Sequence, residues 1–288
     1  MTFADALSLG RVSNLPTVWT NMLTGVVLAG ASLDDPRAWL LLIALTFFYV
    51  AGMYLNDAFD ADIDAVERPE RPVPAGRVSR RTVFAAGYTM LAVAIALMAA
   101  AGSIGATGPW PALAGLALAS VILFYDWHHK RNPLSPVVMG ISRMLVYICA
   151  GLVFVVPPPV LLVVAAVVLL CYLIGLTYVA KQENLGRVRN MWPLVFLAVP
   201  ALYGAMLATH ASWTWIFWVA FIGWVLVALF YLRRRNPGDI PRAVVSLIAG
   251  ISLLDAVLIA GAGATGYAML AVIGFLLTLT LQRFIAGT

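Results

Sequence analysis

A cluster of aspartates directly after a long apolar run is the strongest chemical signal in the chain. Asp57, Asp60 and Asp64 are three and four residues apart, so on a helix at about 100° per residue they share one face, whereas Asp62 points elsewhere. Neighbouring carboxylates repel one another unless a cation lies between them. Mg²⁺ takes one or two carboxylates and completes its shell with water and phosphate oxygens. The spacing therefore favours a Mg²⁺–diphosphate site over the alternative, a solvated acidic loop.

Two further polar segments carry groups suited to a diphosphate. Lys130 and Arg131 offer a point charge and a bidentate fork for phosphate oxygens, although both also suit a role as simple markers of membrane topology. Lys181, Gln182 and Glu183 follow another apolar run. They either share in the same site or only cap the preceding helix.

The composition excludes an ordinary soluble domain. Hydrophobic residues make up 62% of the chain, charged residues only 11%, and the mean hydropathy is +0.94. Long apolar stretches along the whole chain are typical of a polytopic helical membrane protein. The net charge of +5 is therefore no sign of a nucleic-acid partner, and we expect none.

Ten apolar segments are candidate membrane spans. They cover residues 14–31, 38–57, 80–101, 109–127, 134–156, 159–180, 191–209, 212–232, 241–262 and 265–285. With the N-terminus inside, every lysine and arginine except Arg37 and Arg143 lies on the inner side, as the positive-inside rule requires. We therefore expect an all-α membrane bundle in one domain, residues 1–288. The aspartates would face the cytoplasm, in a bacterial inner membrane.

Two charged residues fall within predicted spans, Arg143 and Asp255. An intramembrane charge usually faces the bundle interior, a cavity or a partner. Each is interpreted either as a buried, neutralised residue or as part of a translocation path, which would make the chain a small transporter.

The run Asn56-Asp57-x-x-Asp60-x-x-x-Asp64, continued by Arg68-Pro69-Glu70-Arg71-Pro72, closely resembles the first aspartate-rich motif of the UbiA superfamily of intramembrane prenyltransferases. The segment from Tyr125 to Arg131 also resembles the family's stretch after its fourth helix, and the hydropathy of the first seven or so spans agrees. The resemblance implies a bundle of about nine helices around a central cavity that opens to lipid. It further implies that Mg²⁺ holds an isoprenyl diphosphate there and that the prenyl group passes to a lipophilic acceptor.

The resemblance also implies roles for particular residues. Asp57, Asp60 and Asp64 would be catalytic through Mg²⁺, with Glu183 as a further metal ligand. The diphosphate would contact the basic and amide side chains of Arg11, Asn14, Asn56, Arg68, Arg71, Lys130, Arg131, Lys181 and Gln182. The family's second motif normally reads Lys-Asp-x-x-x-Asp. Gln182 replaces its first aspartate here, so a second Mg²⁺ would be bound more weakly.

The expected function is thus Mg²⁺-dependent prenyl transfer from an isoprenyl diphosphate to a lipophilic, aromatic acceptor within the membrane. The alternatives are an intramembrane terpene cyclase, a non-catalytic member of the same fold, and a transport or lipid-binding protein. The sequence leaves open the acceptor, the prenyl length, the number of metal ions and the oligomeric state.

Overall fold

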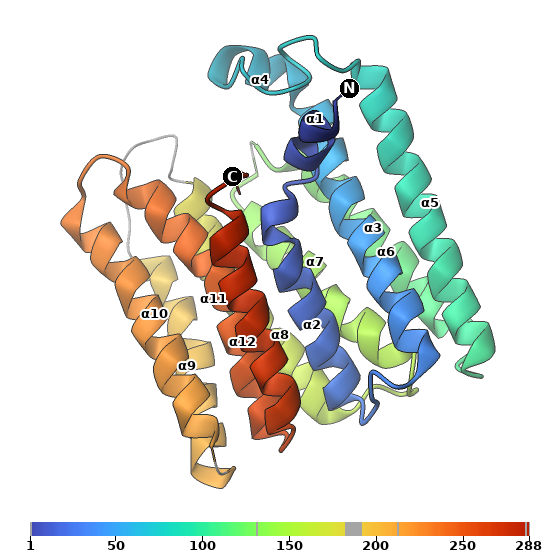
Figure 1. Ribbon diagram of the computed structural model, residues 1–288, viewed down its shortest axis with the longest axis vertical. Helices are drawn as coiled ribbons and strands as arrows, with labels where there is room; N and C mark the ends of the chain where they lie inside the picture. Colours follow the sequence, from blue (N-terminus) through green and yellow to red (C-terminus); the bar gives the residue numbers. More distant parts are fainter. Residues whose placement is uncertain (1, 131, 182–191, 212, 286, 288) are drawn as a thin grey trace.

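The computed structural model describes residues 2–130, 132–181, 192–211, 213–285 and 287, and all regular structure in these ranges is helical (Figure 1). The first half contains α1 (Phe3–Leu9), η1 (Val12–Asn14), α2 (Leu15–Leu28), α3 (Pro36–Phe59), α4 (Ala61–Glu67), α5 (Arg80–Ile104) and α6 (Trp110–His128). The second half contains α7 (Ser135–Leu152), α8 (Val160–Lys181), η3 (Trp192–Leu197), α9 (Ala198–His210), α10 (Thr214–Arg234), α11 (Asp239–Gly261) and α12 (Thr265–Leu281).

Each of the ten predicted spans contains a helix. Among the described residues, eight helices are long and apolar enough to cross a membrane, with η3 and α9 counted together. The first and last predicted spans are shorter than expected, because α2 has 14 residues and α12 has 17. The prediction of an all-α bundle of nine to ten helices is confirmed, with α2 and α12 as the two shorter helices of the set.

Local capping fixes where two of the spans begin. The Asp35 side chain accepts a hydrogen bond of 2.9 Å from the backbone N–H of Arg37, and Pro36 occupies the first turn of α3. The Ser79 hydroxyl accepts one of 3.1 Å from the N–H of Thr82 at the start of α5. Both arrangements satisfy N–H groups that a helix start leaves unpaired.

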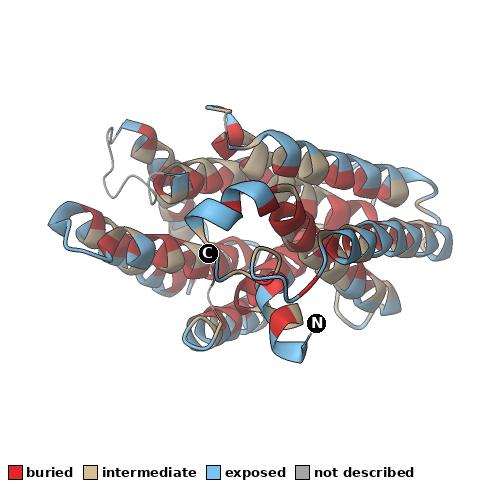
Figure 2. Ribbon diagram, turned by 90° about the horizontal axis from the view of Figure 1, so that it is seen from above, coloured by how far each residue is buried: buried red, intermediate tan, exposed pale blue. Residues whose placement is uncertain are grey.

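The buried residues form two large apolar clusters. One joins α2, α3, α5, α6 and α7, and the other joins α2, α7, α8, α10, α11 and α12. Figure 2 shows buried residues turned into the bundle and exposed ones around its outside. The exposed side chains include large apolar ones such as Trp110 and Phe230, as expected of helices that face lipid. Since α2 and α7 belong to both clusters, they connect the two halves.

The contact between α2 and α7 depends on a glycine. A Cβ atom on Gly25 would lie 2.4 Å from the Cβ of Ala150 and 2.9 Å from the backbone oxygen of Tyr147. Small residues let membrane helices approach closely in this way. One turn before Gly25, Asn21 is therefore held close to α7.

Candidate active site

The aspartate cluster lies where α3 passes into α4, at the same end of the bundle as α1 and both termini (Figure 1). Backbone hydrogen bonds continue across this junction, from Asp60 N–H to Asn56 O at 2.9 Å and from Asp64 N–H to Asp60 O at 2.8 Å. The helical spacing is therefore preserved. Asp57, Asp60 and Asp64 are only 4%, 5% and 1% exposed, whereas the Asp62 side chain is 84% exposed, as the spacing predicts.

Two arginines neutralise two of the buried carboxylates. Arg11 Nη2 lies 2.9 Å from Asp57 Oδ1, and Arg71 Nη1 lies 3.3 Å from the same oxygen and 2.7 Å from Asp64 Oδ2. Arg11 also donates to Asn56 Oδ1 at 3.3 Å. Burial disfavours the charged form of Arg11, but Asp57 together with Tyr49, Tyr125 and Asp126 outweighs burial and raises the pKa of Arg11 above its ordinary value.

Asp60 faces two basic side chains from the connection between α6 and α7. Its Oδ2 lies 3.4 Å from His129 Nε2 and 3.5 Å from Lys130 Nζ, and Lys130 is also 3.7 Å from Glu67. The His129 ring stacks on Tyr125, with 4.8 Å between ring centres. The sequence prediction included Lys130 but missed His129. His129 follows Tyr125 by four residues, so the two side chains lie on one helix face. This spacing is the feature of the sequence from which His129 could have been identified.

Asp126 is a further buried carboxylate that the sequence prediction did not select. It is 4% exposed, and its Oδ1 accepts a hydrogen bond of 3.3 Å from Asn56 Nδ2. Its Oδ2 has no hydrogen-bond partner in the described part of the chain. A buried oxygen without a partner is costly and points to a missing ligand or water.

These carboxylates fit Mg²⁺ in donor chemistry, because Mg²⁺ prefers oxygen ligands and Asp126 leaves an oxygen available. However, no group of three or more His, Cys, Asp or Glu side chains among the described residues is arranged to hold a metal ion. Arg11, Arg71 and Lys130 lie against the carboxylates instead. A metal ion that took over the paired oxygens of these aspartates would have to displace the three side chains.

Two residues of the predicted diphosphate set, Lys181 and Arg68, form no ion pair with the aspartates among the described residues. Lys181 Nζ donates to the backbone oxygen of Asn132 and, at 3.0 Å, to Ser135 Oγ, so it ties α8 to the start of α7. Arg68 ends α4 and forms no ion pair with any described residue. Arg131, Gln182 and Glu183 lie outside the described residues.

Asn14 is bound to the C-terminal segment and not to the aspartates. Its amide nitrogen donates to the Gly287 backbone oxygen at 2.7 Å, and its oxygen accepts from Gln282 at 3.0 Å. The structure therefore brings together Arg11, Asn56, Asp57, Asp60, Asp64, Arg71 and Lys130 from the predicted set.

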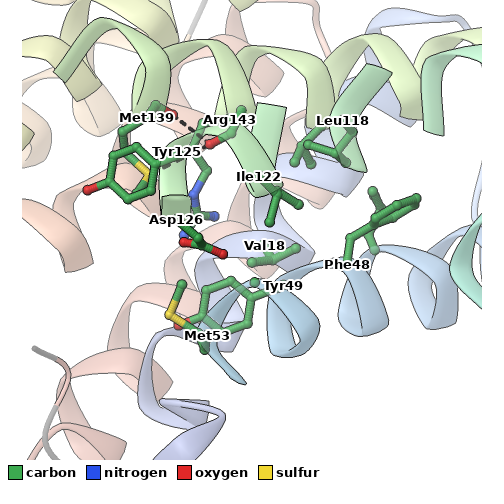
Figure 3. A pocket seen from close by; sticks show the side chains of 14 residues that line it. Val18, Phe48, Tyr49, Met53, Leu118, Ile122, Tyr125, Asp126, Met139 and Arg143 are labelled. Carbon is green, nitrogen blue, oxygen red and sulfur yellow. Dashed lines mark hydrogen bonds between the residues drawn. The ribbon is translucent and has the colours of Figure 1, made fainter. Parts of the chain in front are cut away.

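A cavity of about 80 Å³ adjoins the carboxylate cluster between α2, α3, α6 and α7. Apolar side chains such as Val18, Phe48 and Ile122 form most of its wall. Asp126 and Arg143 are the charged residues that line it (Figure 3). The site thus combines buried carboxylates and cations with an apolar cavity inside the bundle.

Such a bundle of long apolar helices, with a charged cluster at one end and an apolar cavity beside it, defines a multi-pass membrane protein. A model described as the UbiA prenyltransferase family matches residues 17–244. The chain belongs to this family.

Two relatives illustrate the similarity in sequence. Digeranylgeranylglyceryl phosphate synthase of Methanopyrus kandleri is 35% identical over 134 residues, 46% of this chain and 46% of that protein. Protoheme IX farnesyltransferase of Methylocella silvestris is 30% identical over 142 residues, 48% of this chain and 43% of that protein. The chain thus spans less than half the length of these relatives.

Solved structures share the fold. A UbiA homologue from Archaeoglobus fulgidus bound to GPP and Mg²⁺ has a TM-score of 0.60 at 17% identity, over 91% of this chain and 99% of that one. The apo UbiA homologue from Aeropyrum pernix has a TM-score of 0.53 at 16% identity, over 95% of this chain and 97% of that one.

Proposed function

We propose that this protein transfers a prenyl group from an isoprenyl diphosphate to a lipophilic acceptor within the membrane. The observation that carries the proposal is the cluster of Asp57, Asp60 and Asp64 with the cations Arg71 and Lys130, placed next to an apolar cavity. The two named relatives are prenyl-transferring enzymes, and the solved Archaeoglobus homologue holds GPP and Mg²⁺.

Asp57, Asp60, Asp64 and Asp126 are the carboxylates that would hold Mg²⁺, and Glu183 stays a further candidate. When bound, Mg²⁺ would supply positive charge that stabilises the departing diphosphate. Arg11, Arg71 and Lys130 would bind phosphate oxygens. Their side chains are long, and each now lies on a carboxylate that a metal ion would take over.

Prenyl transfer breaks the C–O bond between the prenyl carbon and the diphosphate, which leaves with the electron pair. The nucleophilic atom of the acceptor then forms the new bond and releases its proton. Phe48, Tyr49 and Tyr125 line the cavity and would stabilise the allylic cation through their ring faces. The apolar walls would keep water away from that cation.

We further propose that the site faces the cytoplasm in an integral membrane protein with one domain. The distribution of lysines and arginines supports this orientation. A transport path through Asp255 is less favoured. This residue is fully buried and accepts hydrogen bonds from Asn21, Thr24 and Tyr147, as expected of a structural contact.

Diphosphate release by the purified protein in lipid tests the proposal. Prenyl diphosphates from dimethylallyl to geranylgeranyl are supplied with lipophilic acceptors, with and without Mg²⁺. We expect release that requires Mg²⁺ and falls roughly 100-fold or more in Asp60→Ala, the usual effect of losing a group that stabilises developing charge.

Asp62→Ala is the matched control, because its exposed side chain pairs with Arg80 at 3.0 Å and with no other described residue. It should change release little. Equal losses in the two variants, release without Mg²⁺, or no release from any donor by the folded protein would each contradict the proposal. Release without an acceptor would indicate the cyclase alternative.

A further inference from the structure

Arg143 places a guanidinium group deep in the bundle with few protein partners. It lies eight residues into α7, about 12 Å along the helix axis. Its Nη1 donates to Asn21 Oδ1 at 3.1 Å, and its guanidinium carbon lies 5.6 Å from the centre of the Tyr49 ring. No carboxylate forms an ion pair with it, and no acceptor meets its Nε or Nη2, among the residues that the structure describes. Unmatched donors at this depth are costly.

A hydrogen-bond network holds the Arg143 side chain in place. Asp255 accepts from Asn21 Nδ2 at 2.9 Å, from Thr24 at 3.0 Å and from the Tyr147 hydroxyl. The Asn21 amide therefore presents its nitrogen to Asp255 and its oxygen to Arg143. Since three other donors already satisfy Asp255, the remaining N–H groups of Arg143 are not needed for this network.

Those N–H groups belong to a side chain that lines the cavity beside the carboxylate cluster (Figure 3). Asp126, which binds Asn56 of that cluster, lines the same cavity. Tyr49, beside Arg143, precedes Asn56 by seven residues on α3, which is about 10 Å along the axis. The cavity thus connects the carboxylate cluster with a cation that lies deeper in the membrane.

We propose that Arg143 binds the anionic group, a carboxylate or a phosphate, of the prenyl acceptor. This inference rests on the proposed function and specifies its acceptor class. The planar guanidinium can bind either anion through two parallel hydrogen bonds, and the apolar surroundings strengthen the attraction. An acceptor anchored there would place its lipophilic body along Val18 and Ile122, with its other end toward Asp126 and the donor site.

Binding measured without Mg²⁺ and without a prenyl donor tests this inference separately from turnover. The probes are 4-butylbenzoate, 4-butylphenyl phosphate and the uncharged 4-butylbenzamide, titrated into the protein in an uncharged detergent. We expect at least one anionic probe to bind roughly 10-fold or more tightly than the amide, consistent with one charge-assisted contact. The stronger of the two anionic probes identifies the anion as carboxylate or phosphate.

Arg143→Met should abolish this preference, and Arg143→Lys should retain part of it. Arg37→Met is the matched control, because Arg37 pairs with Asp35 outside the cavity. Equal binding of anionic and neutral probes by the wild type, or no binding of any probe, would overturn the inference even if Arg143→Met failed to fold. An unchanged preference in folded Arg143→Met would also overturn it, as would loss of prenyl diphosphate binding in that variant with probe binding intact.

Failure of this inference would leave the proposed function standing if Mg²⁺-dependent diphosphate release persists. Conversely, probes that bind through Arg143 in a protein that releases no diphosphate would confirm the anion site but contradict the proposed function, and with it the role of Arg143 toward a prenyl acceptor. The two results are read from different assays and cannot be confused.

Discussion

Replacing Arg71 with methionine should change Mg²⁺ binding and diphosphate binding in opposite directions. Arg71 Nη1 bridges Asp64 at 2.7 Å and Asp57 at 3.3 Å, and both carboxylates are buried. A metal ion that uses these oxygens must first displace the guanidinium. The same guanidinium is proposed to bind the phosphate oxygens once it is displaced. Arg71 would therefore oppose Mg²⁺ alone and favour Mg²⁺ together with diphosphate.

The shorter of the two contacts, 2.7 Å from Arg71 to Asp64, sets the expected size of both changes in affinity. A hydrogen bond to a charged group contributes about 1.5–3 kcal/mol. Without the competing Arg71 guanidinium, Mg²⁺ should bind roughly 10- to 100-fold more tightly in the absence of diphosphate. Diphosphate binding in the presence of Mg²⁺ should weaken by a similar factor, because one of its cations is lost.

Calorimetric titration of the purified protein measures whether Mg²⁺ binding becomes tighter and diphosphate binding weaker, as predicted. Mg²⁺ is titrated first alone, and a non-hydrolysable prenyl diphosphonate is then titrated at saturating Mg²⁺. Arg81→Met serves as the control, since Arg81 is an exposed arginine at the start of α5 with no ion pair to any described residue. Unchanged or weaker binding of Mg²⁺ alone to Arg71→Met would refute the reasoning that Arg71 competes with the metal.

Three further outcomes are expected from the structure. Asp126→Asn should raise the Mg²⁺ concentration needed for half-maximal diphosphate release, because it removes a buried carboxylate with an unpartnered oxygen. An unchanged Mg²⁺ curve would contradict this role. Gly25→Ala should lower the free energy of unfolding by about 1–3 kcal/mol, as overpacking does, and a thermal melt measures the loss. Asp5 accepts hydrogen bonds from Thr2 N–H and from Arg77, which lower its pKa from 3.8 to about 2. Its contribution to stability is thus complete above about pH 4 and is lost as the pH falls toward 2, so Asp5→Asn should flatten the stability curve in that interval.

Local properties of the sequence were sufficient for the membrane helices and for the orientation of the aspartates. A span depends on the length and hydropathy of one continuous segment, so each predicted segment contains a helix. The helical period likewise determines that Asp57, Asp60 and Asp64 are buried together while Asp62 is exposed. The short lengths of α2 and α12 were missed, because the predicted spans were extended to residues 31 and 285, past the helix ends at Leu28 and Leu281.

Only the tertiary structure decided which charges meet. Arg11 reaches Asp57 across 46 positions of sequence, and Asn56 reaches Asp126 across 70. These contacts depend on how separate helices pack, and no periodicity within one segment encodes that packing. Asp126 was overlooked for this reason: from the sequence it is an isolated acid in an apolar helix, and its neighbours come from α3. Arg143 could be recognised as an intramembrane charge, but its place in the cavity wall follows from the packing of α2, α3, α6 and α7.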